Sequence, residues 1–270
     1  MPAGSAGHTL QAGGLRIAYK RVGEGSPLIL LHGFFGDSRV WSRQLEDLSD
    51  QFDVVAWDTP GCGRSSDPPD TFRMPDYARC LSAFIQALQL ERPHVLGLSF
   101  GSTLALELYR QQPRLCRTLV LASAYAGWSG SLRADVVEQR LRKTISDLDL
   151  PPAEVVNIYN VPGLLTESAG QTLVDENAAI MSSFHPTGMK AMTHALAEAN
   201  LRDVLPSVDV PTLLLYGDRD VRSPLSVGQD LHSQIPGSRL VVIPGAGHLS
   251  NVEAPDRFND EVRGFLRTAG

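Results

Sequence analysis

The chain has 270 residues, of which 43% are hydrophobic and 20% are charged, and its formal net charge at pH 7 is −6. This length fits one large α/β domain or a domain that carries an insertion, with enough residues to bury a sizeable core. There is no basic run and no apolar run near the ~20 residues that cross a bilayer, so we expect neither nucleic acid nor a membrane as a partner.

Short apolar segments alternate with amphipathic helical patterns along the chain. This alternation predicts the fold class α/β: a mostly parallel central sheet with helices on both faces. In chain order, the predicted strands are Leu15–Val22, Leu28–Leu31, Val54–Trp57, His94–Leu98, Thr118–Ala122, Pro211–Tyr216 and Arg239–Ile243. The predicted helices between and after them are Ser38–Leu48, Pro75–Leu88, Ser226–Gln234 and Pro255–Arg267.

One stretch, between Ser123 and Pro206, contains helical patterns and no convincing strand. Its predicted helices are Leu132–Leu148, Ala153–Tyr159, Gln171–Phe184 and Thr187–Ala199. An all-helical insertion in an α/β sheet is interpreted as a cap over the carboxyl edge, where open α/β sheets bind ligands. We therefore predict an α/β core formed by residues 1–123 and 207–270, and a helical cap formed by residues 124–206.

The most informative motif is Gly97-Leu98-Ser99-Phe100-Gly101, which has the pattern G-x-S-x-G between a predicted strand and an apolar helical segment. A serine on such a sharp turn is held in a strained conformation with its hydroxyl in a cleft. The glycines are needed because side chains there would collide with the neighbouring strand and helix. The N-terminal N–H groups of the helix point to the same cleft, where an oxyanion can bind. The motif alone is a weak signal, because an ordinary Gly/Ser turn can have the same letters.

Two later strands end in residues that would complete a nucleophilic site. Asp218 and Asp220 follow the strand Pro211–Tyr216, and His248 follows the next strand, so these residues are expected at the carboxyl edge with Ser99. Serine needs a base at neutral pH, and a carboxylate fixes the tautomer of that base. Taken singly, the aspartates are typical turn formers and the histidine is typical of a solvated loop. The order Ser, Asp, His on loops of one edge predicts a catalytic triad.

Two glycine-rich loops are expected at the same edge. The segment His32-Gly33-Phe34-Phe35-Gly36 can bring a backbone N–H to the cleft of Ser99, although an ordinary strand-to-helix turn can have this composition. The segment from Asp58 to Ser65 lacks the lysine and spacing of phosphate-binding loops, so we interpret it as a structural turn rich in internal hydrogen bonds.

The cysteines and histidines indicate neither a disulfide framework nor a metal site. Cys62, Cys80 and Cys116 show no C-x-x-C spacing, and His185 and His194 lack metal-ligand spacing. Cys62 lies in a glycine-rich loop and is expected to be partly exposed. Because the N-terminal segment also lacks the pattern of a signal peptide, we expect a reduced, cytoplasmic protein.

These segments together resemble the α/β-hydrolase fold superfamily, and the resemblance covers essentially the whole chain. The segments that match are His32-Gly33-Phe34, Asp58 to Ser65, Gly97-Leu98-Ser99-Phe100-Gly101, Gly217-Asp218-Arg219-Asp220 and Gly247-His248. The resemblance implies a capped serine hydrolase similar to enol-lactone hydrolases and cofactor-free haloperoxidases. Haloalkane dehalogenases and epoxide hydrolases of this fold have aspartate at the elbow, so the serine excludes them.

The resemblance also implies roles for individual residues. Ser99 would be the nucleophile, His248 the base and Asp220, rather than Asp218, the acid. The backbone N–H groups of Phe34 and Phe100 would form the oxyanion hole. No metal and no organic cofactor are expected.

Aromatic and methionine residues of the predicted cap and core loops favour a neutral, apolar substrate. The candidates for the substrate pocket are Phe35, Tyr125, Trp128, Tyr159, Met181 and Phe184. We therefore expect a serine esterase that cleaves a small-molecule carboxylic ester or lactone through an acyl-enzyme, as a monomer or homodimer. A hydrolase of carbon–carbon or amide bonds on the same triad, and a ligand receptor on a hydrolase scaffold, are the alternatives.

Overall fold

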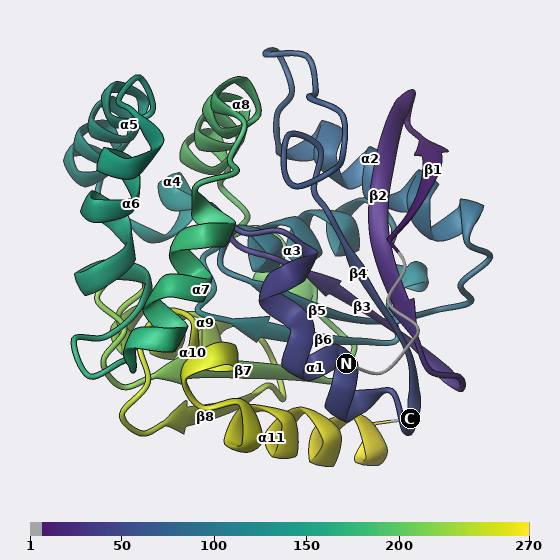
Figure 1. Ribbon diagram of the computed structural model, residues 1–270. Helices are drawn as coiled ribbons and strands as arrows, with labels where there is room; N and C mark the ends of the chain where they lie inside the picture. Colours follow the sequence, from purple (N-terminus) through teal and green to yellow (C-terminus); the bar gives the residue numbers. More distant parts are fainter. Residues whose placement is uncertain (1–6, 270) are drawn as a thin grey trace.

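The computed structural model describes residues 7–269, which form an eight-stranded, mostly parallel sheet with helices on both faces (Figure 1). The strands lie in the order β1-β2-β4-β3-β5-β6-β7-β8. The pairs β1–β2 and β2–β4 are antiparallel, and every other neighbouring pair is parallel. The strands are β1 (His8–Ala12), β2 (Leu15–Val22), β3 (Ser26–Leu31), β4 (Phe52–Trp57), β5 (His94–Leu98), β6 (Thr118–Ala122), β7 (Thr212–Gly217) and β8 (Arg239–Ile243).

The predicted α/β class is confirmed, and the central strands show why their sequences are so apolar. Every residue of β4, β5, β6 and β7 is buried, because helices cover both faces of a parallel sheet. The edge strand β1 was not expected from the sequence. Its five residues are mostly exposed, so they lack a clear hydrophobic pattern.

Among the helices of the α/β part, α1, α2, α3 and α9 pack directly on strands of the sheet. Figure 1 shows α1 and α11 on one face, and α2 and α3 on the other. Local sequence determines where α2 begins: Pro75 lies in its first turn, and the Asp76 carboxylate accepts a hydrogen bond from the Arg73 N–H at 2.9 Å. These helices are α1 (Ser42–Leu48), α2 (Met74–Ala87), α3 (Phe100–Gln111), α9 (Leu225–Gln234), α10 (Ser250–Glu253) and α11 (Pro255–Thr268).

A helical insert separates β6 from β7 in the chain, although these two strands are neighbours in the sheet. Its helices are α4 (Trp128–Ser131), α5 (Ala134–Asp147), α6 (Pro152–Tyr159), α7 (Gln171–Met181) and α8 (Pro186–Glu198). In Figure 1 they form the teal and green group on the left. The insertion expected from the sequence is therefore present.

One of the contacts between the insert and the α/β part joins two glycines. Gly61, in the loop after β4, lies against Gly188, in the first turn of α8. A Cβ atom added at either residue would collide with the Cα atom of the other. The two backbones are therefore in direct contact, with no side chain between them.

The expectation that Cys62 is partly exposed is wrong. Cys62 is buried, and its Sγ lies 3.4 Å from the Sδ of Met192 in α8, so the insert covers this loop. Cys80 and Cys116 are also buried, and all three cysteines are free thiols. None of the helices in residues 7–269 combines the length and apolarity required for a transmembrane span.

Candidate active site

Ser99 occupies the turn between β5 and α3 with φ 53° and ψ −110°, a region that non-glycine residues rarely adopt. Its N–H donates to the Ala122 carbonyl at 2.8 Å, which ties the strained residue to β6. A Cβ at Gly97 would collide with the backbone of Gly101, and a Cβ at Gly101 would collide with the Leu31 carbonyl of β3. The collisions expected from the sequence are present, and they explain why both flanking residues are glycines.

His248 follows β8 and faces Asp220, which follows β7. Its Nδ1 lies 2.9 Å from Oδ2 and 3.0 Å from Oδ1 of the aspartate, and both residues are buried. A carboxylate at Nδ1 fixes the tautomer that leaves Nε2 as the proton acceptor. Ser99 and His248 line the same cavity. The structure therefore brings the three residues of the predicted triad to one place.

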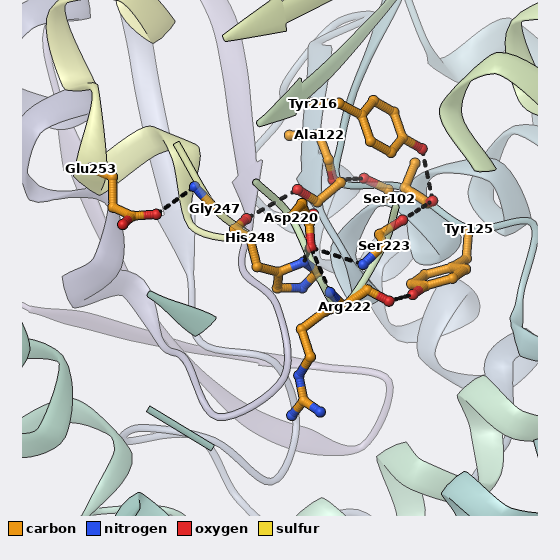
Figure 2. A network of polar contacts seen from close by, with 12 residues as sticks. Ser102, Ala122, Tyr125, Tyr216, Asp220, Arg222, Ser223, Gly247, His248 and Glu253 are labelled. Atoms are coloured by element: carbon orange, nitrogen blue, oxygen red, sulfur yellow. Dashed lines mark hydrogen bonds and ion pairs between the residues drawn. The ribbon is translucent and has the colours of Figure 1, made fainter. Parts of the chain in front are cut away.

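The loop after Asp220 holds its carboxylate in position. Oδ1 accepts hydrogen bonds from the N–H groups of Arg222 and Ser223, each at 2.8 Å (Figure 2). Burial alone would raise the pKa of Asp220, but the charge of His248 and its hydrogen bond outweigh that effect and lower the pKa below its usual value. The carboxylate is therefore held in its ionised form.

Asp218 plays a different part from Asp220. Its side chain is exposed, and Oδ1 accepts the Gly245 N–H at 2.7 Å across the turn that leads to His248. The structure thus pairs His248 with Asp220 and places Asp218 in a turn.

The backbone on each side of the imidazole is anchored. The Ser123 hydroxyl donates to the His248 carbonyl at 3.0 Å, and the Gly247 N–H donates to Oε2 of Glu253 at 2.7 Å (Figure 2). The other oxygen of Glu253 accepts the N–H of Thr166 at 2.9 Å and its hydroxyl at 2.6 Å. Because Thr166 belongs to the insert, this carboxylate links the insert to the His248 loop.

The loop after β3 lies against Ser99: a Cβ at Gly33 would be 3.3 Å from the Ser99 Cβ. Phe34, the next residue, lines the cavity, and Phe100 begins α3. Within residues 7–269, the backbone N–H groups of Phe34 and Phe100 donate no hydrogen bond. These two donors are therefore available for an oxyanion at the cavity.

His32 keeps this loop in place. Its Nδ1–H donates to the Gly33 carbonyl at 2.8 Å, and its Nε2 accepts the Thr59 N–H at 2.9 Å, so the neutral tautomer is fixed. Burial lowers the pKa of His32, which favours this neutral form. The neighbouring loop is built around Asp58, which accepts the N–H groups of Ser38 and Arg64. This loop is the structural turn expected from the sequence.

The cavity beside Ser99 has a volume of about 100 Å³ and lies between the sheet edge and the insert. Four of the six predicted pocket residues line it: Phe35, Tyr125, Trp128 and Tyr159. Met181 and Phe184 do not. Met181 is buried elsewhere in the insert and accepts a hydrogen bond from Asn177, while Phe184 packs behind Phe35 with ring centroids 5.7 Å apart.

Basic side chains in the cavity wall were not expected from the sequence. Arg140 and Lys143 come from α5, and Arg222 comes from the loop that follows Asp220. Arg222 lies only two positions after the candidate acid, which is a signal the sequence does contain. Arg140 gives no such signal, because the pattern of α5 does not reveal which face meets the cavity. Residues 7–269 contain no group of three or more His, Cys, Asp or Glu side chains placed to hold a metal ion.

Comparison with known proteins agrees with the fold described above. Residues 26–147 match the family model described as alpha/beta hydrolase fold, and residues 187–270 match the model described as TAP-like protein. A thermophilic esterase from Thermogutta terrifontis, solved with malate bound, superimposes with a TM-score of 0.89 at 28% identity, over 98% of this chain and 99% of the esterase. The chain belongs to the alpha/beta hydrolase superfamily.

Two further matches are one solved structure and one sequence. The enol-lactonase from Burkholderia xenovorans has a TM-score of 0.88 over 96% of this chain and the whole of that chain, but at 22% identity it is informative about the fold alone. A protein from Pseudomonas savastanoi pv. phaseolicola, provisionally named carbamate hydrolase RutD, is 28% identical over 242 residues. This match covers 88% of this alpha/beta hydrolase and 93% of the relative.

Proposed function

We propose that this alpha/beta hydrolase cleaves a carboxylic ester or lactone, with Ser99 as the nucleophile, His248 as the base and Asp220 as the acid. The observation that carries the proposal is the pairing of His248 Nδ1 with Asp220 at 2.9 Å beside the cavity that also contains Ser99. A serine hydroxyl on a strained turn has no structural need for such a histidine. A nucleophile does need one, because the hydroxyl must lose its proton as it attacks.

In the first half of the reaction, Ser99 Oγ attacks the carbonyl carbon while Nε2 of His248 takes the hydroxyl proton. The carbonyl oxygen becomes an anion, which the N–H groups of Phe34 and Phe100 stabilise. Asp220 stabilises the imidazolium that forms. The bond to the leaving oxygen then breaks, His248 gives its proton to that oxygen, and the acyl group remains on Ser99.

In the second half, His248 removes a proton from a water molecule, and the resulting hydroxide attacks the acyl-enzyme. Collapse of this second intermediate breaks the ester bond to Ser99, whose oxygen regains a proton from His248. The carboxylic acid leaves, and the resting enzyme is restored. The insert that covers the cavity limits the water that reaches the acyl-enzyme.

Cleavage of a carbamate is the second candidate, and the relative provisionally named carbamate hydrolase supports it. The same attack and proton transfers apply, with nitrogen or oxygen as the leaving atom. The esterase from Thermogutta terrifontis, equally similar in sequence and alike in structure over nearly the whole chain, supports ester cleavage. We place ester cleavage first because an ester needs less assistance to its leaving group than an amide nitrogen does.

The test is to assay the purified protein with 4-nitrophenyl acetate and with phenyl carbamate, and to label it with a fluorophosphonate. We expect faster turnover of the ester, and phosphonylation on the peptide that contains Ser99. Ser99→Ala should reduce turnover by on the order of 10⁶-fold, as loss of the nucleophile does in a related triad. Circular dichroism serves as the control for folding.

Three results would contradict the proposal. A folded Ser99→Ala protein that kept a tenth of the activity would remove Ser99 from the mechanism. Faster cleavage of the carbamate would favour the second candidate. A wild-type protein that binds these compounds without turnover would support the ligand receptor instead.

A further inference from the structure

The guanidinium of Arg222 lies in the wall of the cavity without an acidic partner. It stacks over the Tyr159 ring, 4.7 Å from the centroid. Its backbone N–H binds Asp220, but the side chain projects away from that carboxylate (Figure 2). Within residues 7–269, the side chain of Arg222 forms neither an ion pair nor a hydrogen bond. A partly buried cation with these surroundings is costly unless something else compensates it.

A second guanidinium, that of Arg140, lines the same cavity and is held at the backbone carbonyl of Arg222. Nη1 of Arg140 donates to the Tyr125 hydroxyl at 3.1 Å, and Nη2 donates to the Arg222 carbonyl at 3.3 Å. Its Cζ lies 6.0 Å from the centroid of the Trp128 ring. In the described part of the chain, Arg140 pairs with no carboxylate either. Neutral groups thus fix its position and leave its charge uncompensated.

The carboxylates near the cavity are already engaged. Asp220 faces His248, as described above. Asp147 accepts a hydrogen bond from the Tyr159 hydroxyl at 2.6 Å and pairs with Lys143 at 2.8 Å. Burial lowers the pKa of Arg222, and the neighbouring charge of Arg140 lowers it further, yet a guanidinium remains protonated at neutral pH. The cavity therefore carries an excess of positive charge.

From this arrangement we infer that Arg140 and Arg222 form a subsite for a carboxylate carried by the substrate. The inference rests on the proposed function and narrows it to esters or lactones that bear an acidic group apart from the scissile bond. Guanidinium groups match a carboxylate in shape and charge, and such charge-assisted hydrogen bonds are stronger than neutral ones. The cavity has a volume of about 100 Å³, so we expect the ester of a short-chain acid.

The test compares esters that differ only in this charge. Monomethyl succinate is paired with methyl 4-methylpentanoate, and monomethyl glutarate with methyl 5-methylhexanoate, so that an isopropyl group replaces the carboxylate. For the wild-type protein we expect kcat/KM to be at least 10-fold higher for the charged ester of one pair. Hydrogen bonds to a charged group are worth about 1.5–3 kcal/mol, which corresponds to a factor of roughly 10 to 100.

Single substitutions test whether the two arginines cause the preference for the charged ester. Arg222→Gln and Arg140→Gln should each lower the ratio of charged to neutral kcat/KM at least 10-fold. Arg142→Gln is the matched control, because it removes the same charge from α5 at an exposed site paired with Glu138, and it should change the ratio less than twofold. Equal kcat/KM of the wild-type protein for the charged and the neutral ester in both pairs would overturn the inference. So would a ratio that Arg222→Gln and Arg140→Gln leave unchanged.

A binding measurement tests the anion subsite independently of the proposed esterase activity. In the Ser99→Ala background, isothermal titration should show that, in at least one of the two pairs, the charged ester binds at least 10-fold more tightly than its neutral counterpart, and that adding Arg222→Gln removes the difference. If that binding is seen but the wild-type protein hydrolyses neither ester, the anion subsite stands and the proposed esterase activity fails. If the wild-type protein hydrolyses both esters while the titration shows no charge preference, the activity stands and the subsite fails.

Discussion

Asp220 and Arg222 are joined directly: the backbone N–H of Arg222 donates to Oδ1 of Asp220 at 2.8 Å. One short loop therefore orients the carboxylate that faces His248 and also carries a guanidinium of the cavity wall. The proposed acid and the inferred anion subsite depend on the same backbone conformation. A substitution that changes a side chain here can be interpreted only if this hydrogen bond is kept.

Asp220→Asn should reduce ester turnover by roughly 10⁴-fold, because an amide that donates to His248 Nδ1 favours the wrong tautomer. Asp218→Asn is the matched control. Its oxygen can still accept the Gly245 N–H, so turnover should stay within a few-fold of the wild type. Steady-state kinetics on one aryl ester measures both. A severe loss in the Asp218 variant alone would reverse the assignment of the acid.

Trp128→Ala should shift the preferred acyl chain length upward, because the indole lines the small cavity. Each additional buried methylene is worth about 0.8 kcal/mol, so kcat/KM should rise about fourfold per carbon over the range that the new space admits. The rate at which a small phosphonate labels Ser99 should change less than the chain-length preference does. Phe184→Ala removes a ring that does not line the cavity, and its chain-length profile should resemble the wild type. If the chain-length profile of the Trp128 variant were unchanged, Trp128 would not be a residue that limits the acyl chain length.

Gly101→Ala should destabilise the protein by about 1–3 kcal/mol or more, because the new Cβ would collide with the carbonyl of Leu31 in β3. Gly264→Ala makes the same change inside α11, where nothing lies within 4 Å of the added Cβ. There, stability should rise by about 0.5–1 kcal/mol, since alanine is the better helix former. Urea unfolding monitored by circular dichroism measures both variants. Similar free energies of unfolding for the two would refute the packing argument.

His94 should make the protein less stable in mild acid. Burial lowers its pKa from 6.5 to about 4, with a smaller contribution from the charge of Arg117. Between these values the unfolded chain binds a proton that the folded protein does not. The stability that His94 provides is therefore complete above pH 6.5 and is lost as the pH falls towards 4.

Urea unfolding at several pH values between 7.5 and 4.5 tests this expectation. The wild-type protein should lose stability across the window, and His94→Gln should lose less. The His94→Gln variant should keep part of the pH dependence of stability, because burial also lowers the pKa of His32. Identical slopes in the two proteins would show that His94 is not the group responsible.

Strong local patterns made much of the architecture predictable. The buried strands and the helical insert follow from apolar runs and helical periodicity, and the elbow follows from Gly97 and Gly101, whose missing side chains the packing requires. The expected position of Ser99, His248 and both candidate aspartates at one edge followed from a single topological rule, that the carboxyl ends of parallel strands meet at the same edge of the sheet. The choice of Asp220 over Asp218 came from the resemblance to the α/β-hydrolase fold superfamily.

The rest depends on contacts that no local pattern encodes. β1 is a mostly exposed edge strand, so its residues carry little hydrophobic signal. Whether Met181 meets the cavity or the interior of the insert depends on how α7 is rotated, and Arg140 faces the cavity only because of the way α5 packs. Counting apolar residues therefore favoured a neutral substrate and overlooked the arginines.

The contact between Gly61 and Gly188 has a mechanical consequence for the cavity. Because both sides of the contact are backbone, no side chain can change its rotamer to make room. A methyl group added at Gly61 or Gly188 would therefore have to displace the backbone of α8 or of the loop after β4. That helix packs on α5 and contributes Leu196 to the cavity wall. The contact between Gly61 and Gly188 therefore limits how closely α8, and with it Leu196 in the cavity wall, can approach the loop after β4.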